Sequence, residues 1–284
     1  MAKKNALAII DPSDFQIIPA AEDMEAVLEE LKDIERIPYG RITIGSGGLN
    51  VFKVLEPGDE NASSTDEVVG VILFSHKVNV KWATKFGVKT EGPKTPECSS
   101  IDGDTGIIAA TGECRECRTC PYNQFGSADN GIGKACRNMR RLYIMREGDV
   151  FPIILSLPAT SLKAFDFYRT RLAVLKKTPQ AVLTKITLKA TTSKDDAEFS
   201  VAVFSSEGAL PAAEVARVRT YAAQFEEAAK NVDIDGVDDG ARAEPYTPKY
   251  PAPPANSQNG EFIEVDSDEV DPFAPSDGGE IEDF

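Results

Sequence analysis

The chain has 284 residues, of which 42% are hydrophobic and 27% charged, enough for one large core or two small ones. No apolar run approaches the roughly 18 to 20 residues that span a membrane. The N-terminal Met-Ala-Lys-Lys and the apolar run after it are too short for a signal peptide. We therefore expect a cytoplasmic protein with no membrane partner.

The net charge of −15 at first argues against a phosphate-binding function, but its distribution reverses that argument. Residues 232–284 hold 15 Asp and Glu against Arg242 and Lys249, a balance of −13. The first 231 residues are therefore nearly neutral, at about −2. We expect a folded domain over residues 1–231 and a disordered acidic tail over residues 232–284.

Apolar periodicity predicts the secondary structure of the folded domain. In chain order the expected elements are a helix over 21–34, strands over 41–44, 51–55 and 68–74, a cysteine-rich segment, a hairpin of strands 141–145 and 151–157, a helix over 162–176 with Ser161 as N-cap, strands over 182–191 and 198–204, and a helix over 211–231. Three strands, a helix and two strands is the order of an OB-fold. We expect an α+β protein with an OB-fold-like five-stranded barrel, flanking helices and a zinc-binding insertion at 98–137, before the third strand.

All five cysteines lie between residues 98 and 136, and two overlapping C-x-x-C knuckles stand at the centre of this segment. Four thiolates can hold one structural Zn²⁺ if folding brings a tight pair and a distant pair together. We select Cys98, Cys117, Cys120 and Cys136, with Cys114 as the alternate ligand. An iron–sulfur cluster is the competing interpretation, because C-x-x-C-x-x-C followed by Pro also resembles half of a ferredoxin motif.

Basic residues alternate with aromatic rings in and before the cysteine segment. Cations that follow phosphates and rings that stack on unpaired bases are the two parts of sequence-tolerant single-strand binding. The predicted DNA contacts are Lys77, Lys81, Trp82, Lys85, Phe86, Tyr122, Phe125, Lys134, Arg137, Arg140, Arg141 and Tyr143. The alternative to DNA contact is that the rings pack in the core and the charged side chains are only solvated. This alternative is strongest for Tyr143, which lies in a predicted strand.

A family resemblance can be named from these residues. The run from Cys120 to Ser127, through 133–137 and on to 157–163, resembles a zinc-containing group of bacteriophage and mobile-element single-stranded DNA-binding proteins, over about residues 98–175. The tail is similar to those of bacterial and phage SSB proteins. Asp271-Pro272-Phe273 resembles the bacterial SSB tip but is internal, and the end, with Ile281, Asp283 and Phe284, resembles that of some phage proteins.

The resemblance implies a protein that coats and protects single-stranded DNA in phage replication or recombination. It also implies that the tail recruits replication and recombination proteins and competes with DNA for a basic groove. A strand-annealing recombination protein and a zinc adaptor that binds only proteins are the alternatives. We do not expect an enzyme, because His76 is the single histidine and the carboxylates outside the tail form no catalytic constellation.

Overall fold

The structure is a computed structural model that describes residues 39–45, 48–82, 96–129, 131–192 and 198–230. The chain divides into two units, residues 1–247 and 248–284, and every described residue belongs to the first. The helix expected over 21–34 and the acidic tail, with the docking residues proposed near its end, lie outside the described residues.

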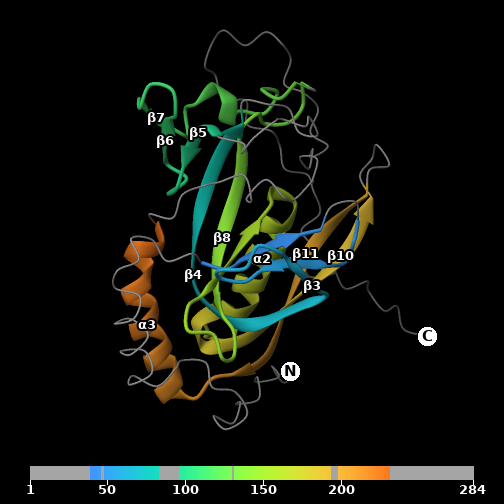
Figure 1. Cartoon of the computed structure of the whole chain (residues 1–284), viewed down its shortest axis with the longest axis vertical. Helices are drawn as coiled ribbons and strands as arrows, with labels where there is room; N and C mark the ends of the chain where they lie inside the picture. The colour runs from blue at the N-terminus through green and yellow to red at the C-terminus, as the bar shows by residue number, and fades with distance from the viewer. Residues whose placement is uncertain (1–38, 46–47, 83–95, 130, 193–197, 231–284) are drawn as a thin grey trace, which may run out of the picture. The chain divides into compact units, whose positions relative to one another are not determined.

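The described residues form an open, 11-stranded sheet with two α-helices, which makes the protein a mixed α+β structure (Figure 1). The strands are β1 Arg41–Ile44, β2 Phe52–Leu55, β3 Ser63–Thr65, β4 Glu67–Trp82, β5 Pro96–Ser100, β6 Thr105–Ile108, β7 Cys114–Glu116, β8 Arg137–Met145, β9 Ile153–Leu157, β10 Val182–Thr192 and β11 Glu198–Ala209. The helices are α2 Ala159–Val174 and α3 Ala212–Lys230, with the 3₁₀ turns η1 Pro121–Asn123 and η2 Pro179–Ala181.

The strands follow the order β3-β2-β1-β9-β8-β4-β5-β6-β7, and β10 joins the sheet by pairing with both β4 and β11. All of these pairings are antiparallel except that of β1 with β9. No pairing between described strands closes the sheet, so the expected five-stranded barrel is not confirmed.

Strand β4 organises the sheet, because its 16 residues pair with β10 over their first four positions and with β8 over most of the rest. We expected this strand to end at Phe74, but buried Val78 and Val80 carry the alternation on to Trp82. The cysteine segment, with β5, β6, β7 and η1, therefore lies between β4 and β8 at the top of Figure 1. The segment follows the strand predicted at 68–74, as expected, but its assignment as an insertion before the third strand of a barrel is not confirmed.

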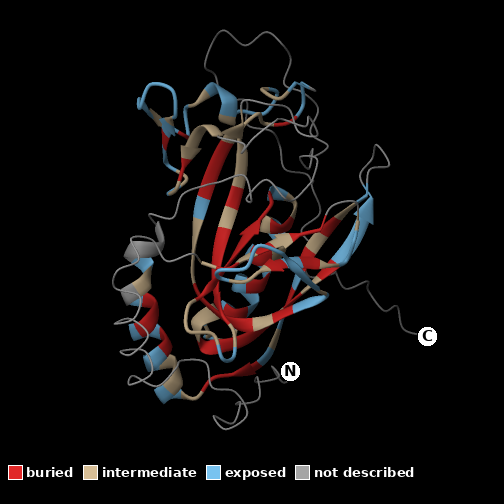
Figure 2. Ribbon diagram, viewed as in Figure 1, coloured by how far each residue is buried: buried red, intermediate tan, exposed pale blue. Residues whose placement is uncertain are grey.

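The two helices cover opposite faces of the sheet. Successive residues of a strand point to opposite faces, so the residues of β4 that pack under each helix show which face that helix covers. On β4, Val68 and Ile72 belong to the core under α2, whereas Val71 and Leu73 belong to the core under α3. Figure 2 shows the buried positions concentrated on the sheet and on the inner sides of both helices. The β6–β7 region is largely exposed in the same view.

Helix α2 begins at Ala159, three residues earlier than expected, and Ser161 is not its N-cap. Ser161 is buried in the first turn, where its hydroxyl accepts a hydrogen bond from the backbone N–H of Ala202 on β11 at 3.0 Å. Ser200, also on β11, donates from its hydroxyl to the carbonyl of Leu49, between β1 and β2, at 2.8 Å.

Candidate metal centre and its basic rim

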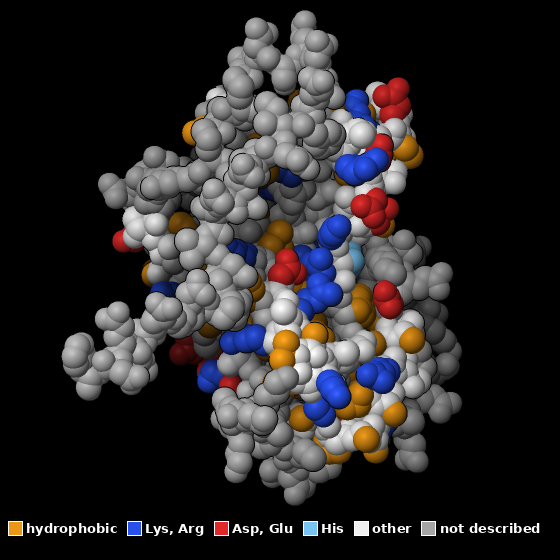
Figure 3. All heavy atoms as spheres, turned by 180° about the vertical axis from the view of Figure 1, so that it is seen from behind, with side chains coloured by type: hydrophobic (Ala, Val, Ile, Leu, Met, Phe, Trp, Pro, Cys, Tyr) orange, Lys and Arg blue, Asp and Glu red, His pale blue; other side chains and the backbone are white. Residues whose placement is uncertain are grey.

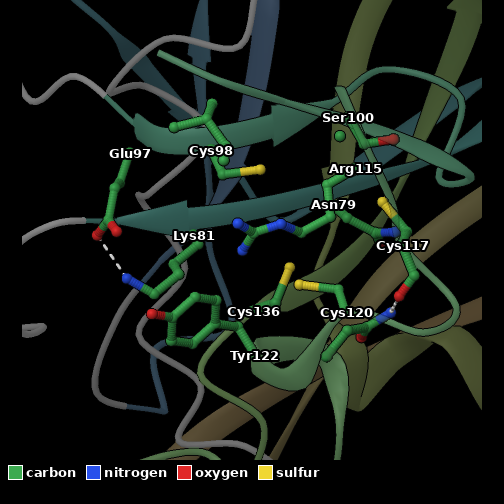
Figure 4. A pocket seen from close by; sticks show the side chains of 13 residues that line it. Asn79, Lys81, Glu97, Cys98, Ser100, Arg115, Cys117, Cys120, Tyr122 and Cys136 are labelled. Atoms are coloured by element: carbon green, nitrogen blue, oxygen red, sulfur yellow. Dashed lines mark hydrogen bonds and ion pairs between the residues drawn. The ribbon is translucent and has the colours of Figure 1, made fainter. Parts of the chain in front are cut away.

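Four of the five cysteines line one cavity of about 120 Å³ in the segment between β4 and β8 (Figure 4). Cys98 lies on β5, Cys117 follows β7, Cys120 precedes η1 and Cys136 precedes β8. Cys114 on β7 is exposed and does not line the cavity. The structure thus brings together the four thiols that the spacing selected and places the alternate one apart.

Gly106 on β6 allows two of the sulfurs to approach each other. A Cβ atom at this position would lie 3.0 Å from the Sγ of Cys98 and 3.5 Å from the Sγ of Cys117. The two sulfurs therefore border the same small volume above β6. A side chain at position 106 would push the Cys98 sulfur away.

Backbone hydrogen bonds hold the other ligand positions in place. The N–H of Cys117 donates to the carbonyl of Asp104 at 2.7 Å, and the N–H of Cys136 donates to the carbonyl of Tyr122 at 2.8 Å. Asn123 closes the knuckle, because its N–H donates to the Cys120 carbonyl at 3.0 Å and its side-chain amide to the Cys117 carbonyl at 2.8 Å. These bonds fix the backbone of the Cys117–Cys120 pair and tie the start of β8 to it.

Crowding of the thiols opposes their ionisation. Burial, followed by the charges of Cys117, Cys120 and Cys98, raises the pKa of Cys136 to about 12. Burial and the same kind of repulsion also raise the pKa of Cys98, although the nearby Arg115 guanidinium acts in the opposite direction. A cation among the sulfurs would reverse this effect, because metal coordination favours the thiolate.

The donor set fits a tetrahedral zinc site in number and type, since four thiolates at about 2.3 Å from the ion are one of its standard ligand sets. As the side chains are placed, no group of three or more His, Cys, Asp or Glu residues within the described ranges is arranged to hold an ion. To bind Zn²⁺, the four cysteine side chains would therefore have to rotate toward the centre of the cavity, while the backbone hydrogen bonds described above stay in place.

Tyr122 lines the cavity and Phe125 follows it by three residues, and each of these exposed rings has a lysine over its face. The ammonium of Lys81 lies 4.4 Å from the ring centroid of Tyr122, and that of Lys134 lies 5.0 Å from the ring centroid of Phe125. Tyr122 is 39% exposed and Phe125 is 64% exposed. Lys81 also forms an ion pair with Glu97. Beside the candidate metal centre the two rings are therefore exposed, whereas Lys81 is mostly buried and ion-paired and Lys134 is half-buried.

Two of the predicted DNA contacts are buried, and the structure removes them from the contact set. Arg141 and Tyr143 are both 0% exposed. The Tyr143 ring stacks on Phe74, with centroids 4.3 Å apart, and its hydroxyl lies 3.2 Å from Nε2 of His76. Both residues point to the face of β8 opposite Arg140, where they are packed inside the protein.

The remaining predicted contacts are divided. Lys77 is exposed on β4, and Arg137 and Arg140 are half-buried on β8. Trp82 is half-buried at the end of β4, where it packs against a small apolar cluster that includes Val78 and Met139. Lys85 and Phe86 lie outside the described residues.

Sequence reasoning missed the contribution of α2. The guanidinium carbon of Arg169 lies 5.8 Å from the ring centroid of Phe165, and that of Arg140 lies 5.9 Å from the same centroid. A basic residue on an amphipathic helix carries no signal of its own, because most such residues are merely solvated. Only the packing of α2 on the sheet brings Arg169 near Arg140.

The chain was compared with protein-family models, with curated proteins and with solved structures, and none of them matches it. None of the helices in the described ranges has the length and apolar character needed to cross a bilayer.

Proposed function

We propose that this protein binds single-stranded DNA without strong sequence preference and that its cysteine segment binds one structural zinc ion. The observation that carries the proposal is the pair of exposed rings, Tyr122 in the lining of the four-cysteine cavity and Phe125 three residues further along the chain, each with a lysine over its face. Unpaired bases stack on such rings and phosphates are attracted to such cations, and neither interaction requires a particular base.

The strand order supports the same proposal. Strands β4, β8 and β9, then α2, then β10 and β11 follow the strand-strand-strand-helix-strand-strand order of an OB-fold, and β4 pairs with both β8 and β10. In this correspondence the cysteine segment is the loop between the first two strands, a loop that binds oligonucleotides in OB-folds. Strand β1, which pairs in parallel with β9, would be an addition at the edge of the barrel.

Zinc would hold the loop together. Cys98, Cys117, Cys120 and Cys136 would be its ligands, and the ion would supply a fixed crosslink between β5, the η1 turn and the start of β8. The rings and lysines of the rim would then be presented in a constant arrangement, so that less ordering entropy is lost when DNA binds.

The acidic tail completes the proposal. We infer that residues 271–273 and 281–284 dock replication or recombination proteins in the cytoplasm, as the SSB resemblance implies. Their apolar residues stand among carboxylates, a composition that suits a short docking motif beside a nearly neutral domain.

The test is a fluorescence anisotropy titration with labelled oligo(dT) and with a duplex of equal length, at two salt concentrations. Wild-type protein should bind the single strand more tightly, and more weakly at the higher salt. Phe125→Ala should weaken binding about 5- to 150-fold, the equivalent of about 1 to 3 kcal/mol of stacking. The matched control is Phe167→Ala, because Phe167 is 59% exposed and has Lys163 over its ring at 5.5 Å. Phe167 stands two residues from both Phe165 and Arg169 on α2, so it points to the other side of this helix, where it lines a cavity with Lys189 and Val203.

The Phe167→Ala variant should bind as the wild type does. The proposal would be abandoned if the wild type showed no salt-sensitive affinity for oligo(dT). Equal losses in the two variants would remove Phe125 from the binding surface.

A further inference from the structure

Two arginines from different elements stand at one buried ring. Arg140 on β8 and Arg169 on α2 place their guanidinium carbons 5.9 and 5.8 Å from the centroid of Phe165, which is itself 1% exposed. Each guanidinium group lies against this aromatic ring, an arrangement that attracts the cation to the ring. Their positions are thereby set by the packing of α2 on the sheet.

The charge of this pair is only partly balanced by protein groups. Arg169 has Asp166 at 3.7 Å, and both side chains are about half exposed or more, so this ion pair is weak. Arg140 donates a hydrogen bond to the hydroxyl of Ser75 at 3.1 Å and has no carboxylate at ion-pair distance among the described residues. Burial and the charge of Arg169 lower the pKa of Arg140, and together they outweigh the opposite effect of the Asp166 carboxylate. An anion would relieve this repulsion.

Hydrogen-bonded polar side chains lead from the cysteine segment along β8 toward the arginine pair. Lys134 donates to Oδ1 of Asn138 at 3.2 Å, and the side-chain amide of Asn138 donates to Oδ1 of Asn123 at 3.0 Å. Asn138 and Arg140 are two residues apart on β8, so they share a face and stand about 7 Å apart. Figure 3 shows Lys and Arg side chains gathered across the middle of one face of the molecule, with few Asp and Glu among them.

We propose that Arg140 and Arg169 bind a backbone phosphate of the same DNA strand that contacts the cysteine segment. The DNA-binding surface would then extend from Phe125 and Lys134 across β8 to α2. This inference rests on the proposed function and extends it to a helix that sequence reasoning left out. A guanidinium presents paired N–H donors that match the oxygens of a phosphodiester, which is why two of them at one place suit this ligand.

The test is the salt dependence of binding by Arg169→Gln and by a matched control, Arg217→Gln. Arg217 lies on α3, on the opposite side of the sheet, and pairs with Glu214 three residues earlier, as Arg169 pairs with Asp166. The two arginine side chains are 47% and 48% exposed, and both substitutions remove one positive charge. Affinity for labelled oligo(dT) is measured by anisotropy at four NaCl concentrations, and log Kd is plotted against log salt.

The slope of the Arg169→Gln plot should be smaller than that of the wild type by about 0.7, the value for one phosphate contact on a single strand. The double variant Arg140→Gln/Arg169→Gln should lose no more than about 1.4. Arg217→Gln should keep the wild-type slope. Equal slopes for Arg169→Gln and Arg217→Gln would overturn the inference while leaving the proposed function intact, whereas a wild type without salt-sensitive binding would remove the proposed function itself.

A second arm identifies the source of the phosphate. Inorganic phosphate replaces chloride at constant ionic strength, and the difference between the Arg169 and Arg217 variants is measured again. It should persist, because a diester on a bound strand has a high effective concentration at the pair. Loss of the difference would show a site for free phosphate and would overturn the inference.

Discussion

Cys136→Ser is the most informative perturbation of the candidate metal centre, and Cys114→Ser is its control. Both replace a thiol of the same short segment, but Cys136 lines the cavity whereas Cys114 is exposed outside it. We expect wild-type protein and Cys114→Ser to bind one Zn²⁺ per chain. Cys136→Ser should bind it far more weakly, because three thiolates and a hydroxyl replace four thiolates.

The structure also predicts that loss of zinc destabilises the cysteine segment but not the sheet. Neither of the two larger apolar cores contains a residue from the segment 96–136. The free energy of metal binding, about 10 to 16 kcal/mol in isolated zinc-finger peptides, would therefore order the loop and not the sheet. The free energy of unfolding of the sheet should fall by less than about 2 kcal/mol in Cys136→Ser.

The assays are metal analysis after dialysis, urea unfolding followed by far-UV circular dichroism, and limited proteolysis. Cys136→Ser should lose the ion and be cut between residues 110 and 134, while its main unfolding transition stays near that of the wild type. A full equivalent of zinc in Cys136→Ser would refute the ligand assignment. A collapse of the main transition in Cys136→Ser, absent from Cys114→Ser, would refute the separation of loop and core.

Two further predictions concern the scaffold. Tyr168→Phe should lower the free energy of unfolding, measured by urea titration, by about 1 to 3 kcal/mol. The buried hydroxyls of Tyr168 and Thr184 lie 2.8 Å apart, and the Thr184 hydroxyl would lose its hydrogen-bond partner. An unchanged free energy of unfolding, or no recovery when Thr184→Val is added, would contradict this prediction. Burial raises the pKa of Asp102, but hydrogen bonds from the N–H groups of Thr105 and Asp104 outweigh it and hold that pKa below its usual range. This carboxylate should therefore stabilise its turn above the ordinary Asp pKa and lose that effect as pH falls through the lowered value. Amide exchange at Thr105 should lose this acid dependence in Asp102→Asn, and an unchanged pH profile would contradict the assignment.

Local patterns in the sequence were sufficient to predict much of the sheet. The alternating runs near 41–44, 182–191 and 198–204 are strands in the structure, and the hairpin across residues 147–149 joins β8 to β9. Such runs can be recognised in the sequence because side chains of a strand alternate between its two faces with a period of two residues, independent of its neighbours. The same pattern does not say which strands pair, so it could not show that β4 and β8, the two strands that flank the cysteine segment, are neighbours in the sheet.

The DNA contacts show the same division. The sequence identifies Tyr122, Phe125 and Tyr143 as rings among basic residues, and only the predicted strand around Tyr143 favours a core position for it. Only folding distinguishes them: Tyr122 and Phe125 stand on a polar loop with little apolar material to cover them, while Tyr143 is stacked beneath Phe74. Arg141 was misassigned for the same reason, since a charged residue in a strand can point to either face.

By itself the sequence determined the chemistry available to this protein: four thiols at metal-binding spacing, a nearly neutral domain with a strongly acidic end, and cations interleaved with rings. The tertiary structure decided which of these groups share a place. It gathered Cys98 and Cys136 from segments 38 residues apart, excluded Cys114, and set Arg169 beside Arg140. Spacing and composition are local properties of a chain, whereas proximity between distant residues depends on strand pairing and on which faces are buried.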